Sequence, residues 1–428
     1  MSSPSLPEKD ASIPLDALRV CIVAEHASLQ FGGEASLPLH YFSRLRARNV
    51  EVWLVIHGRT RHEMELLFPD DQERIRYIPD RWYHKLIWKL GRPLPRRIAE
   101  ATFGTLMVLI NQLLQRGQVK ELINQHQVNI IHQPIPVSPK TPSFISGLGV
   151  PVVIGPMNGG MNYPAAFRRD ESMVTRVAVT IGRASANLAN RIISGKMNAT
   201  ILLVANQRTR MALPNGTRGK IIEIAENGVD LAIWSPASSS VPAPVPARFV
   251  FIGRLIDLKR LDFVLHALVD LPDALLEVIG DGPMRAVWTA KAESLGVAER
   301  VRWRGWLSQA QCAERLQGAT ALLLPSICEC GGAVVLEAMA CGIPAVAISW
   351  GGPADYIDET CGFLIDPANE ESIIKGFVDA NRKLASDPAL RTRLGLAGRR
   401  RVELLFDWDQ KISRILEIYR ESILRYRS

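Results

Sequence analysis

The sequence predicts an α/β fold built from two doubly wound parallel sheets. Short apolar strand candidates alternate with amphipathic helix candidates through both halves of the 428-residue chain, as expected for parallel sheets covered by helices. The first strand candidate, residues 18–24, is apolar almost without interruption, which indicates burial on both faces. A chain of this length has room for two or three domains, and 47% hydrophobic with 22% charged residues is typical of a globular protein.

In the N-terminal half, the strand candidates are separated by helices and by glycine-containing loops. The candidates are residues 18–24, 50–57, 129–132, 151–154, 201–205 and 220–224. Helices are expected over residues 34–46 and 101–114, and the second of these is apolar but too short to span a membrane. Residues 1–14 lack the apolar core of a signal peptide, so we expect a frayed tail there.

The C-terminal half repeats this alternation more regularly. Its strand candidates are residues 248–252, 275–279, 301–305, 322–324 and 345–348, and its main helix candidates are residues 333–341, 370–384, 388–403 and 408–426. We therefore expect a tail (1–17), an N-terminal domain (18–220), a C-terminal domain (221–405) and a final helix (406–428). Residues 235–246, rich in proline and serine, are expected to form an exposed loop.

One stretch of the C-terminal half predicts a binding site for an anion. The strand at residues 322–324 leads through Gly331 and Gly332 into a helix that begins at Ala333. Such a helix start directs the N–H groups of Gly332, Ala333 and Val334, and the positive end of the helix dipole, at one spot. Phosphate is the anion that we expect there.

Two carboxylates flank this spot, Glu329 in the loop and Glu337 in the helix. Phosphate alone gives no reason for acids beside it, whereas a carboxylate accepts hydrogen bonds from pairs of hydroxyl groups. We therefore expect a ribose at Glu337 and a second sugar at Glu329, one at each end of a diphosphate. The alternative is an amphipathic helix on which Glu337 is merely solvated.

The stretch from Pro325 to Pro344, PSICECGGAVVLEAMACGIP, resembles the signature of the retaining nucleotide-sugar glycosyltransferases of group 1, the GT4 family. The family usually has an aromatic residue where this chain has Gly331, which leaves more room beside the sugar. The resemblance implies the GT-B architecture, in which two Rossmann-like domains face one cleft, and a final helix that crosses back to the first domain. It extends from about residue 18 to the C-terminus.

Two cations after the strand at residues 248–252 fit the same ligand. Gly253, Arg254, Leu255 and Lys259 resemble an element of the family, and the two cations can neutralise a diphosphate and its charge as it leaves. Taken alone, Arg254 and Lys259 would be read as surface charges. With Glu329 they are the catalytic candidates that the resemblance implies.

Other C-terminal features have less definite interpretations. The turn at residues 280–283 resembles a dinucleotide fingerprint but lacks its third glycine, so we interpret it as structural. Trp306 follows a strand where relatives bind the base, and it either stacks on the base or covers the core. Residues 226–230 resemble a turn near the hinge of the family.

The N-terminal half contains two further glycine loops at strand ends. Gly32 and Gly33 precede a helix and form a second candidate for donor binding. Residues 155–162 resemble a loop of one branch of the family, and there we expect Asn158 and Gly159 on the acceptor side. Many relatives have a histidine over the reacting sugar in this region, but this chain has none between His132 and His266, so no catalytic histidine is named.

Residues 81–97 are basic and aromatic, with no acid. The cations are Arg81, Lys85, Lys89, Arg92, Arg96 and Arg97, and Trp82, Tyr83 and Trp88 lie between them. This composition suits attachment to an anionic membrane, as does the net charge of +8. A solvated basic face is the alternative. No nucleic acid is expected as a partner, because no recognised reading motif accompanies these residues.

The expected absence of a metal and of a further cofactor rests on the same interpretation of the diphosphate site. We expect no metal and no cofactor besides the nucleotide-diphosphate sugar, since the two cations and the helix dipole can neutralise the leaving group. Cys328 and Cys330 lack the second ligand pair of a zinc site. Six scattered cysteines fit a reducing compartment, so we expect a cytoplasmic protein, attached to the inner face of the cytoplasmic membrane.

The function expected is the retaining transfer of a sugar from a nucleotide-diphosphate donor to a hydroxyl of a glycan or lipid-linked acceptor, in bacterial polysaccharide or lipid-linked glycan synthesis. Two alternatives remain: a nucleotide-sugar epimerase of the same architecture, and a non-catalytic protein that binds sugar nucleotides or membranes. The sequence does not indicate the base, the sugar or the acceptor.

Overall fold

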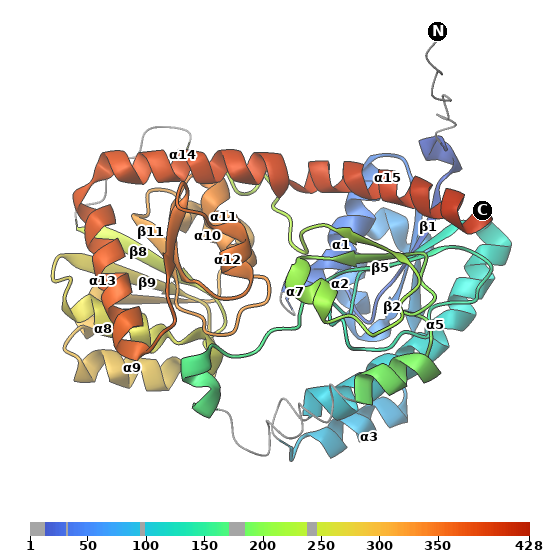
Figure 1. Ribbon diagram of the computed structural model, residues 1–428, viewed down its shortest axis with the longest axis horizontal. Helices are drawn as coiled ribbons and strands as arrows, with labels where there is room; N and C mark the ends of the chain where they lie inside the picture. The colour runs from blue at the N-terminus through green and yellow to red at the C-terminus, as the bar shows by residue number, and fades with distance from the viewer. Residues whose placement is uncertain (1–12, 31–32, 95–98, 171–184, 238–245) are drawn as a thin grey trace, which may run out of the picture.

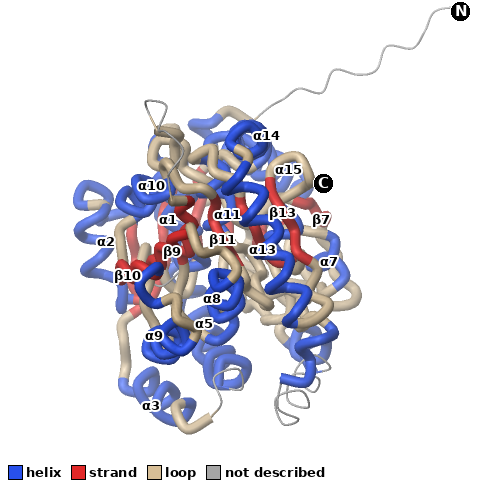
Figure 2. Tube along the Cα trace, turned by 90° about the vertical axis from the view of Figure 1, so that its left-hand side faces the viewer, coloured by secondary structure: helices blue, strands red, loops and turns tan. Residues whose placement is uncertain are grey.

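The computed structural model describes residues 13–30, 33–94, 99–170, 185–237 and 246–428. Two domains lie side by side, each with a parallel sheet between helices, and the last two helices run along one edge of both (Figure 1). The tube view shows α3 (Trp82–Gly91) at the opposite end of the molecule from these two helices (Figure 2). The expectation of two doubly wound parallel sheets is confirmed.

The N-terminal sheet has seven strands in the order β3-β2-β1-β4-β5-β6-β7, all paired in parallel. The strands are β1 (Arg19–Val23), β2 (Glu51–His57), β3 (Ile75–Ile78), β4 (Ile130–Gln133), β5 (Val152–Met157), β6 (Ile201–Val204) and β7 (Lys220–Glu223). Most side chains of β1, β2, β4, β5 and β6 are buried, as their apolar sequences predict.

Helices cover both faces of this sheet. The helices are α1 (Gly33–Ala47), α2 (Arg61–Leu67), α3, α5 (Thr105–His126) and α7 (Gln207–Met211), and a π-helical turn, η4 (Glu100–Gly104), precedes α5. The helix expected over residues 101–114 therefore continues to His126. Its extension has a physical basis, because buried Gln115 donates to the carbonyl oxygen of Ala24 (2.6 Å) at the end of β1.

The C-terminal sheet has six parallel strands in the order β10-β9-β8-β11-β12-β13. The strands are β8 (Ala247–Ile252), β9 (Ala274–Ile279), β10 (Val301–Gly305), β11 (Ala321–Leu324), β12 (Ala345–Ile348) and β13 (Gly362–Ile365). The helices are α8 (Leu261–Val269), α9 (Arg285–Ser294), α10 (Gln309–Leu316), α11 (Ala333–Ala340), α12 (Gly352–Tyr356), α13 (Glu370–Ser386) and α14 (Pro388–Leu405).

The junction between the domains differs from the expected boundary at residue 220. β7 begins there and pairs with β6, so the first sheet continues to Glu223. The last helix, α15 (Trp408–Arg427), leaves the C-terminal domain and packs Trp408, Ile412 and Tyr419 into the N-terminal core. The backbones of Val229 and Trp408 pair beside this crossing.

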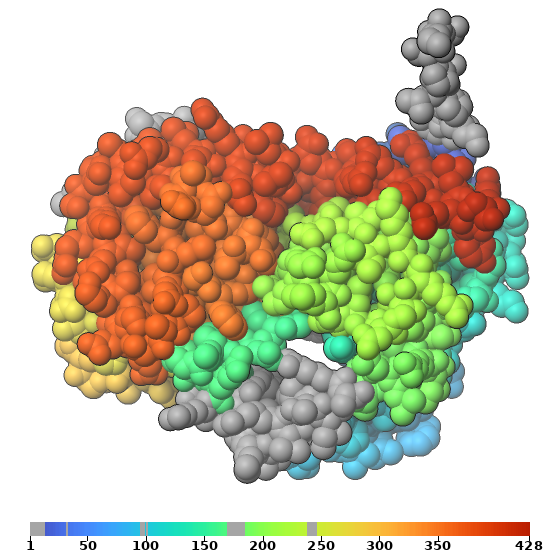
Figure 3. All heavy atoms as spheres, viewed as in Figure 1, coloured from blue at the N-terminus to red at the C-terminus, as the bar shows by residue number. Residues whose placement is uncertain are grey.

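A second crossing comes from the connection between β5 and β6. We call residues 159–168 the crossing segment, because they leave the N-terminal domain and lie against the C-terminal one (Figures 1 and 3). Phe167 is buried in the C-terminal core, where the guanidinium of Arg260 lies 5.6 Å from its ring centroid. The indole Nε1 of Trp350 donates to the carbonyl oxygen of Asn162 (2.8 Å).

No helix in the described ranges has both the length and the apolarity needed to cross a bilayer. The loop expected at residues 235–246 lies mostly outside the described residues.

Candidate functional site

The predicted anion site lies at the start of α11. β11 ends at Leu324, Gly332 adopts a φ of 77° that favours glycine, and α11 begins at Ala333. Among the described residues, no side chain caps this helix start, so the N–H groups of Gly332, Ala333 and Val334 remain available to a ligand. Gly332, Ala333 and Val334 therefore lie where the sequence places them.

Close backbone packing fixes the loop before α11. The N–H of Gly352 donates to the carbonyl oxygen of Glu329 (2.8 Å). A Cβ atom at Gly351 would overlap this same carbonyl oxygen, and one at Gly352 would overlap that of Gly331. The loop that carries Glu329 can approach α12 this closely only because both positions are glycine.

Lys259 and Glu329 form an ion pair. Lys259 ends a short 3-10 turn after β8, and the N–H of Ile327 donates to the carbonyl oxygen of the neighbouring Leu258 (3.2 Å). Both side chains are mostly buried, with 17% and 16% exposed. From the sequence we expect Lys259 at the diphosphate and Glu329 at the sugar, and the structure brings the two side chains into direct contact.

Arg254 lies at the same strand end and is exposed. Its loop is supported by the turn at residues 280–283, because the N–H of Leu255 donates to the carbonyl oxygen of Asp281 (2.9 Å). A Cβ atom at Gly280 would overlap the carbonyl oxygen of Gly253. The turn is therefore structural, as predicted, and it holds in place the loop that carries Arg254.

Glu337 lies in the second turn of α11. Burial raises the pKa of its carboxyl group to about 7, although the residue as a whole is only half-buried. Burial first, and then the charge of Glu337, raise the pKa of the thiols of Cys312 and Cys341. Among the described residues, no hydrogen bond or ion pair engages this carboxyl group, so it differs from Glu329, which is held by Lys259.

Asn158 connects the two domains at the site. Its amide Nδ2 donates to the Oε2 of Glu226 (2.6 Å) and to the carbonyl oxygen of Cys330 (2.8 Å), next to Glu329. Burial raises the pKa of the Glu226 carboxyl to about 7, against the opposing effect of the hydrogen bond from Asn158. The sequence placed Glu226 in a hinge turn but gave no sign that its side chain reaches the site.

The room expected beside Gly331 is already occupied. A Cβ atom at Gly331 would overlap the Nδ2 of Asn227 and lie 3.3 Å from the Oε2 of Glu226. The missing aromatic side chain is therefore replaced by the hinge residues, and the expectation of extra room beside the sugar is wrong.

The remaining candidates lie in the N-terminal domain. Gly32 is outside the described residues, whereas Gly33 begins α1. Gly159 donates its N–H to the Oγ1 of Thr209 (3.0 Å) and packs against Pro139. Its position beside Asn158 puts it next to the contact between the domains.

Two aromatic side chains are assigned by their surroundings. His132 is fully buried between the carbonyl oxygen of Gly155 (2.6 Å) and the hydroxyl of Tyr419 (2.7 Å), so its role is structural. Burial lowers its pKa to about 4. Trp306 is 69% exposed beyond β10, which excludes the reading that it covers the core.

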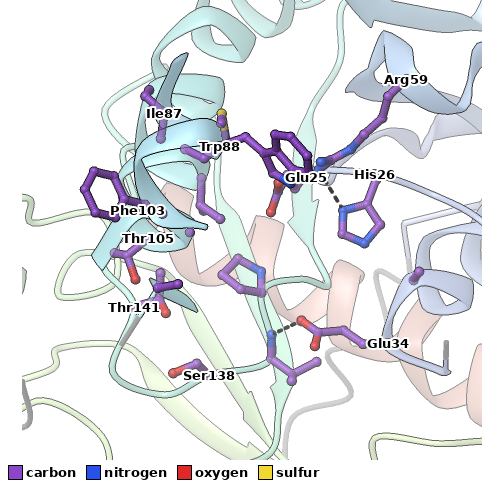
Figure 4. Close-up of a pocket in the computed structure, with 18 of the residues that line it drawn as sticks. Glu25, His26, Glu34, Arg59, Ile87, Trp88, Phe103, Thr105, Ser138 and Thr141 are labelled. Atoms are coloured by element: carbon purple, nitrogen blue, oxygen red, sulfur yellow. Dashed lines mark hydrogen bonds and ion pairs between the residues drawn. The ribbon is translucent and has the colours of Figure 1, made fainter. Parts of the chain in front are cut away.

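A cavity of about 810 Å³ opens in the N-terminal domain (Figure 4). One wall comes from α3, η4 and α5, and the other from the ends of β1 and β2 and the loop after β4. Asn158 also lines it, so the cavity reaches the contact between Asn158 and the loop of Glu329. Asn158 thus lies both at this cavity and at the loop of Glu329.

Comparison with solved structures defines the class of fold. The sucrose-phosphate synthase of Thermosynechococcus elongatus aligns with a TM-score of 0.63 at 18% identity, over 94% of this chain and 98% of that one. The Anabaena protein HepE in complex with UDP aligns with a TM-score of 0.64 at 16% identity, over 94% and 99%. The fold is GT-B.

Residues 239–401 match the family model described as "Glycosyl transferases group 1". This stretch, less than half of the chain, is similar to the group 1 glycosyltransferases. The D-inositol 3-phosphate glycosyltransferase of Streptomyces avermitilis is 33% identical over 236 residues, which are 49% of this chain and 48% of that protein. The chain thus matches about half the length of this curated relative.

Proposed function

We propose that the protein is a retaining glycosyltransferase that moves a sugar from a nucleotide diphosphate to an acceptor hydroxyl. The observation that carries this proposal is the arrangement around α11, where an uncapped helix start lies between two carboxylates and beside Lys259. The family match over residues 239–401 supports it, since this range includes the whole arrangement. Synthesis of a bacterial polysaccharide or lipid-linked glycan is the setting that we propose.

In the proposed reaction, the bond between the anomeric carbon and the diphosphate oxygen breaks, and the electron pair remains on that oxygen. Arg254, Lys259 and the N–H groups at the start of α11 stabilise the charge that develops there. The acceptor oxygen bonds to the anomeric carbon from the same face, and its proton passes to the departing phosphate oxygen. Glu329 orients the sugar, and Glu337 binds the ribose.

This assignment gives Lys259 two partners during the cycle. In the structure it pairs with Glu329, and we propose that the donor diphosphate replaces part of this contact. The carboxylate of Glu329 then becomes free to accept hydrogen bonds from the sugar. No metal or other cofactor is included in the proposal, because the cations and the helix start supply the positive charge.

Mass spectrometry of the purified protein with UDP-, GDP- and ADP-sugars tests the proposal. A transferase should hydrolyse its donor slowly to the nucleoside diphosphate and the free sugar, and EDTA should not change the rate. UDP-sugars are the first choice, because the fold neighbour HepE is solved with UDP. An epimerase would instead convert the donor with no acceptor present, and a non-catalytic protein would leave every donor intact.

The two carboxylates should respond differently to substitution. Glu337→Gln should weaken donor binding by roughly 10-fold to 100-fold, because hydrogen bonds to a charged group contribute about 1.5–3 kcal/mol. Glu329→Gln should mainly lower kcat, since the sugar contact matters most as the bond breaks. Steady-state kinetics with the donor varied separates the two effects, and equal behaviour of the variants would reverse our assignment of roles.

The raised pKa of Glu337 adds a pH dependence to this test. Ribose hydroxyls bind the ionised carboxylate more tightly than the protonated carboxyl group. In the protein without a bound donor, the pKa of the Glu337 carboxyl is about 7. Donor affinity should therefore be greatest above pH 7 and should fall by up to about tenfold per pH unit below it. Glu337→Gln should flatten this profile, whereas an unchanged profile would assign the pH dependence to another group such as Glu226.

We also propose that α3 attaches the protein to an anionic membrane, at the inner face of the cytoplasmic membrane. Trp82 is 74% and Trp88 60% exposed, and Lys85 and Lys89 are exposed on the same helix. Buried His84 and Ile87 face the domain instead. Aromatic side chains at the level of the headgroups and cations toward lipid phosphates suit such a surface. Arg96 and Arg97 lie outside the described residues.

Vesicle flotation tests the attachment. Anionic liposomes should lift the protein at low salt and release it at high salt, since each cation near the surface contributes about 1 kcal/mol. The triple variant Trp82→Ser, Lys85→Ser, Lys89→Ser should stay at the bottom of the gradient. A matched triple variant of exposed residues far from α3, Lys375→Ser, Lys383→Ser, Leu396→Ser, should float like the parent. Equal flotation of both variants would contradict the role of α3.

A further inference from the structure

The N-terminal cavity has two chemically different walls. Its apolar wall is formed by Ile87 and Trp88 of α3, Phe103 of η4, and Met107 and Val108 of α5. Its polar wall contains Glu25, His26, Arg59 and Asn158 (Figure 4). Thr105, Ser138 and Thr141 also line the cavity and interrupt its apolar surface. A ligand made only of sugar would still leave the apolar side chains of this wall without an apolar contact.

The polar wall is an organised set of charged and hydrogen-bonding groups at the ends of β1 and β2. Arg59 forms an ion pair with Glu25, and its Nη2 lies 3.2 Å from the Nδ1 of His26. A guanidinium can only donate, so the Nδ1 of His26 accepts and the ring carries its proton on Nε2. The polar wall therefore presents charged and hydrogen-bonding groups, both donors and acceptors, at this end of the cavity.

The apolar wall is built by two helical segments that approach closely. A Cβ atom at Gly91 of α3 would lie 3.4 Å from the Cβ of Phe103, so glycine at this position lets α3 lie against η4. The Arg92 guanidinium lies 5.1 Å from the ring centroid of Trp88, at the outer rim of the cavity. The apolar wall thus continues outward to the exposed aromatic and basic surface of α3.

Asn158 shows which end of the cavity lies nearer to the loop of Glu329. This residue lines the polar part and donates to the carbonyl oxygen of Cys330, beside Glu329. A ligand in the cavity thus has one end near the loop that holds the donor sugar and the other end along α3 and α5.

We propose that this cavity binds an amphiphilic acceptor, with its hydroxyl-bearing head at Arg59, His26 and Asn158 and an apolar chain between α3 and α5. The proposal rests on the proposed transferase function and adds the class of acceptor and its site. The chain can come from a membrane lipid or from a soluble amphiphile, because the same wall recognises both.

Calorimetric titration with methyl, butyl and octyl β-D-glucopyranoside, each below its critical micelle concentration, tests the cavity without requiring turnover. Burial of a methylene group strengthens binding by at most about fourfold. The octyl glycoside has four more methylene groups than the butyl one, and with these groups partly buried it should bind roughly tenfold more tightly. Equal affinities for the three glycosides would overturn the inference.

Substitutions locate the chain. Phe103→Ser should remove the dependence of affinity on chain length, because it places a polar group in the apolar wall. Leu113→Ser is the matched control, since Leu113 is an exposed residue of α5 that does not line the cavity. It should keep the dependence, and thermal melting should show that both variants are folded. Loss of the dependence in both variants, or in neither, would show that the chain binds elsewhere.

Binding of the chain in the cavity and binding on the membrane-facing surface of α3 are separated by the variant Trp82→Ser, Lys85→Ser, Lys89→Ser, whose residues do not line the cavity. This variant should keep the dependence on chain length even where it no longer floats with liposomes. If it loses both properties together, the chain binds the membrane-facing surface and the cavity assignment is wrong. Donor hydrolysis tests the proposed transferase function separately, so failure of one proposal does not conceal failure of the other.

Discussion

Lys259→Ala is expected to lower kcat roughly 100-fold or more, the loss typical for one preorganised donor at a developing charge, about 3 kcal/mol. The ammonium group is mostly buried and pairs with Glu329, so its removal also leaves a carboxylate without its partner. Arg254→Ala should lower kcat by a similar factor, because Arg254 lies at the end of the same strand. Steady-state kinetics with the donor sugar measures both effects.

Lys375→Ala is the matched control, because Lys375 is an exposed residue of α13 that forms an ion pair with Asp379 of its own helix. It should retain parental turnover. Near-parental turnover in both Lys259→Ala and Arg254→Ala would mean that the diphosphate is not bound at this strand end. A loss of turnover in Lys259→Ala alone would mean that Lys259, and not Arg254, stabilises the charge of the diphosphate.

Gly352→Ala is expected to abolish most of the activity and to reduce the free energy of unfolding by about 1–3 kcal/mol, the range for an overpacked interior. The added methyl group would overlap the carbonyl oxygen of Gly331 and displace the loop that carries Glu329. The hydrogen bond from the N–H of Gly352 to the carbonyl oxygen of Glu329 would be disturbed as well. Donor hydrolysis and urea unfolding measure the two effects.

Gly117→Ala provides the comparison. Gly117 lies inside α5, and a Cβ atom there would meet no atom within 4 Å. Alanine should therefore stabilise the protein by up to about 1 kcal/mol with unchanged activity. If Gly352→Ala behaved like Gly117→Ala, the tight packing between α12 and the donor loop would not be required for the reaction.

The sequence predicts the strands that are buried along most of their length, such as β1 and β11, and also β7 and β10, in which most side chains are not buried. β3 and β13 were not predicted, and in each of them only the two end residues are buried. In β3 the polar Arg76 interrupts the apolar pattern, whereas β13 has a short apolar run at residues 363–365. The full length of α5 was not predicted, also because of side chains that interrupt an apolar pattern. Asn111, Gln112 and Gln115 are buried polar residues that interrupt its apolar pattern, and their partners lie in distant parts of the chain.

In the candidate site, too, the sequence predicts some features, whereas others depend on the folded structure. Gly332 and Glu337 could be placed because one short stretch of sequence contains the loop, the helix start and the carboxylate. The pairing of Lys259 with Glu329 could not, because 70 residues separate them and only the order of strands in the sheet brings their loops together. The contact of Asn158 with Glu226 depends further on how the two domains meet, and local sequence carries no signal for this.

The crossing segment and α15 limit how the N-terminal and C-terminal halves of related proteins can be exchanged. Phe167 completes the core of the C-terminal domain, whereas Trp408 and Ile412 complete that of the N-terminal domain. Each half thus relies on side chains encoded in the other half of the gene. A single crossover near residue 224 would therefore join cores that evolved with different partners, and a functional hybrid would have to inherit residues 159–168 with its C-terminal half and α15 with its N-terminal half.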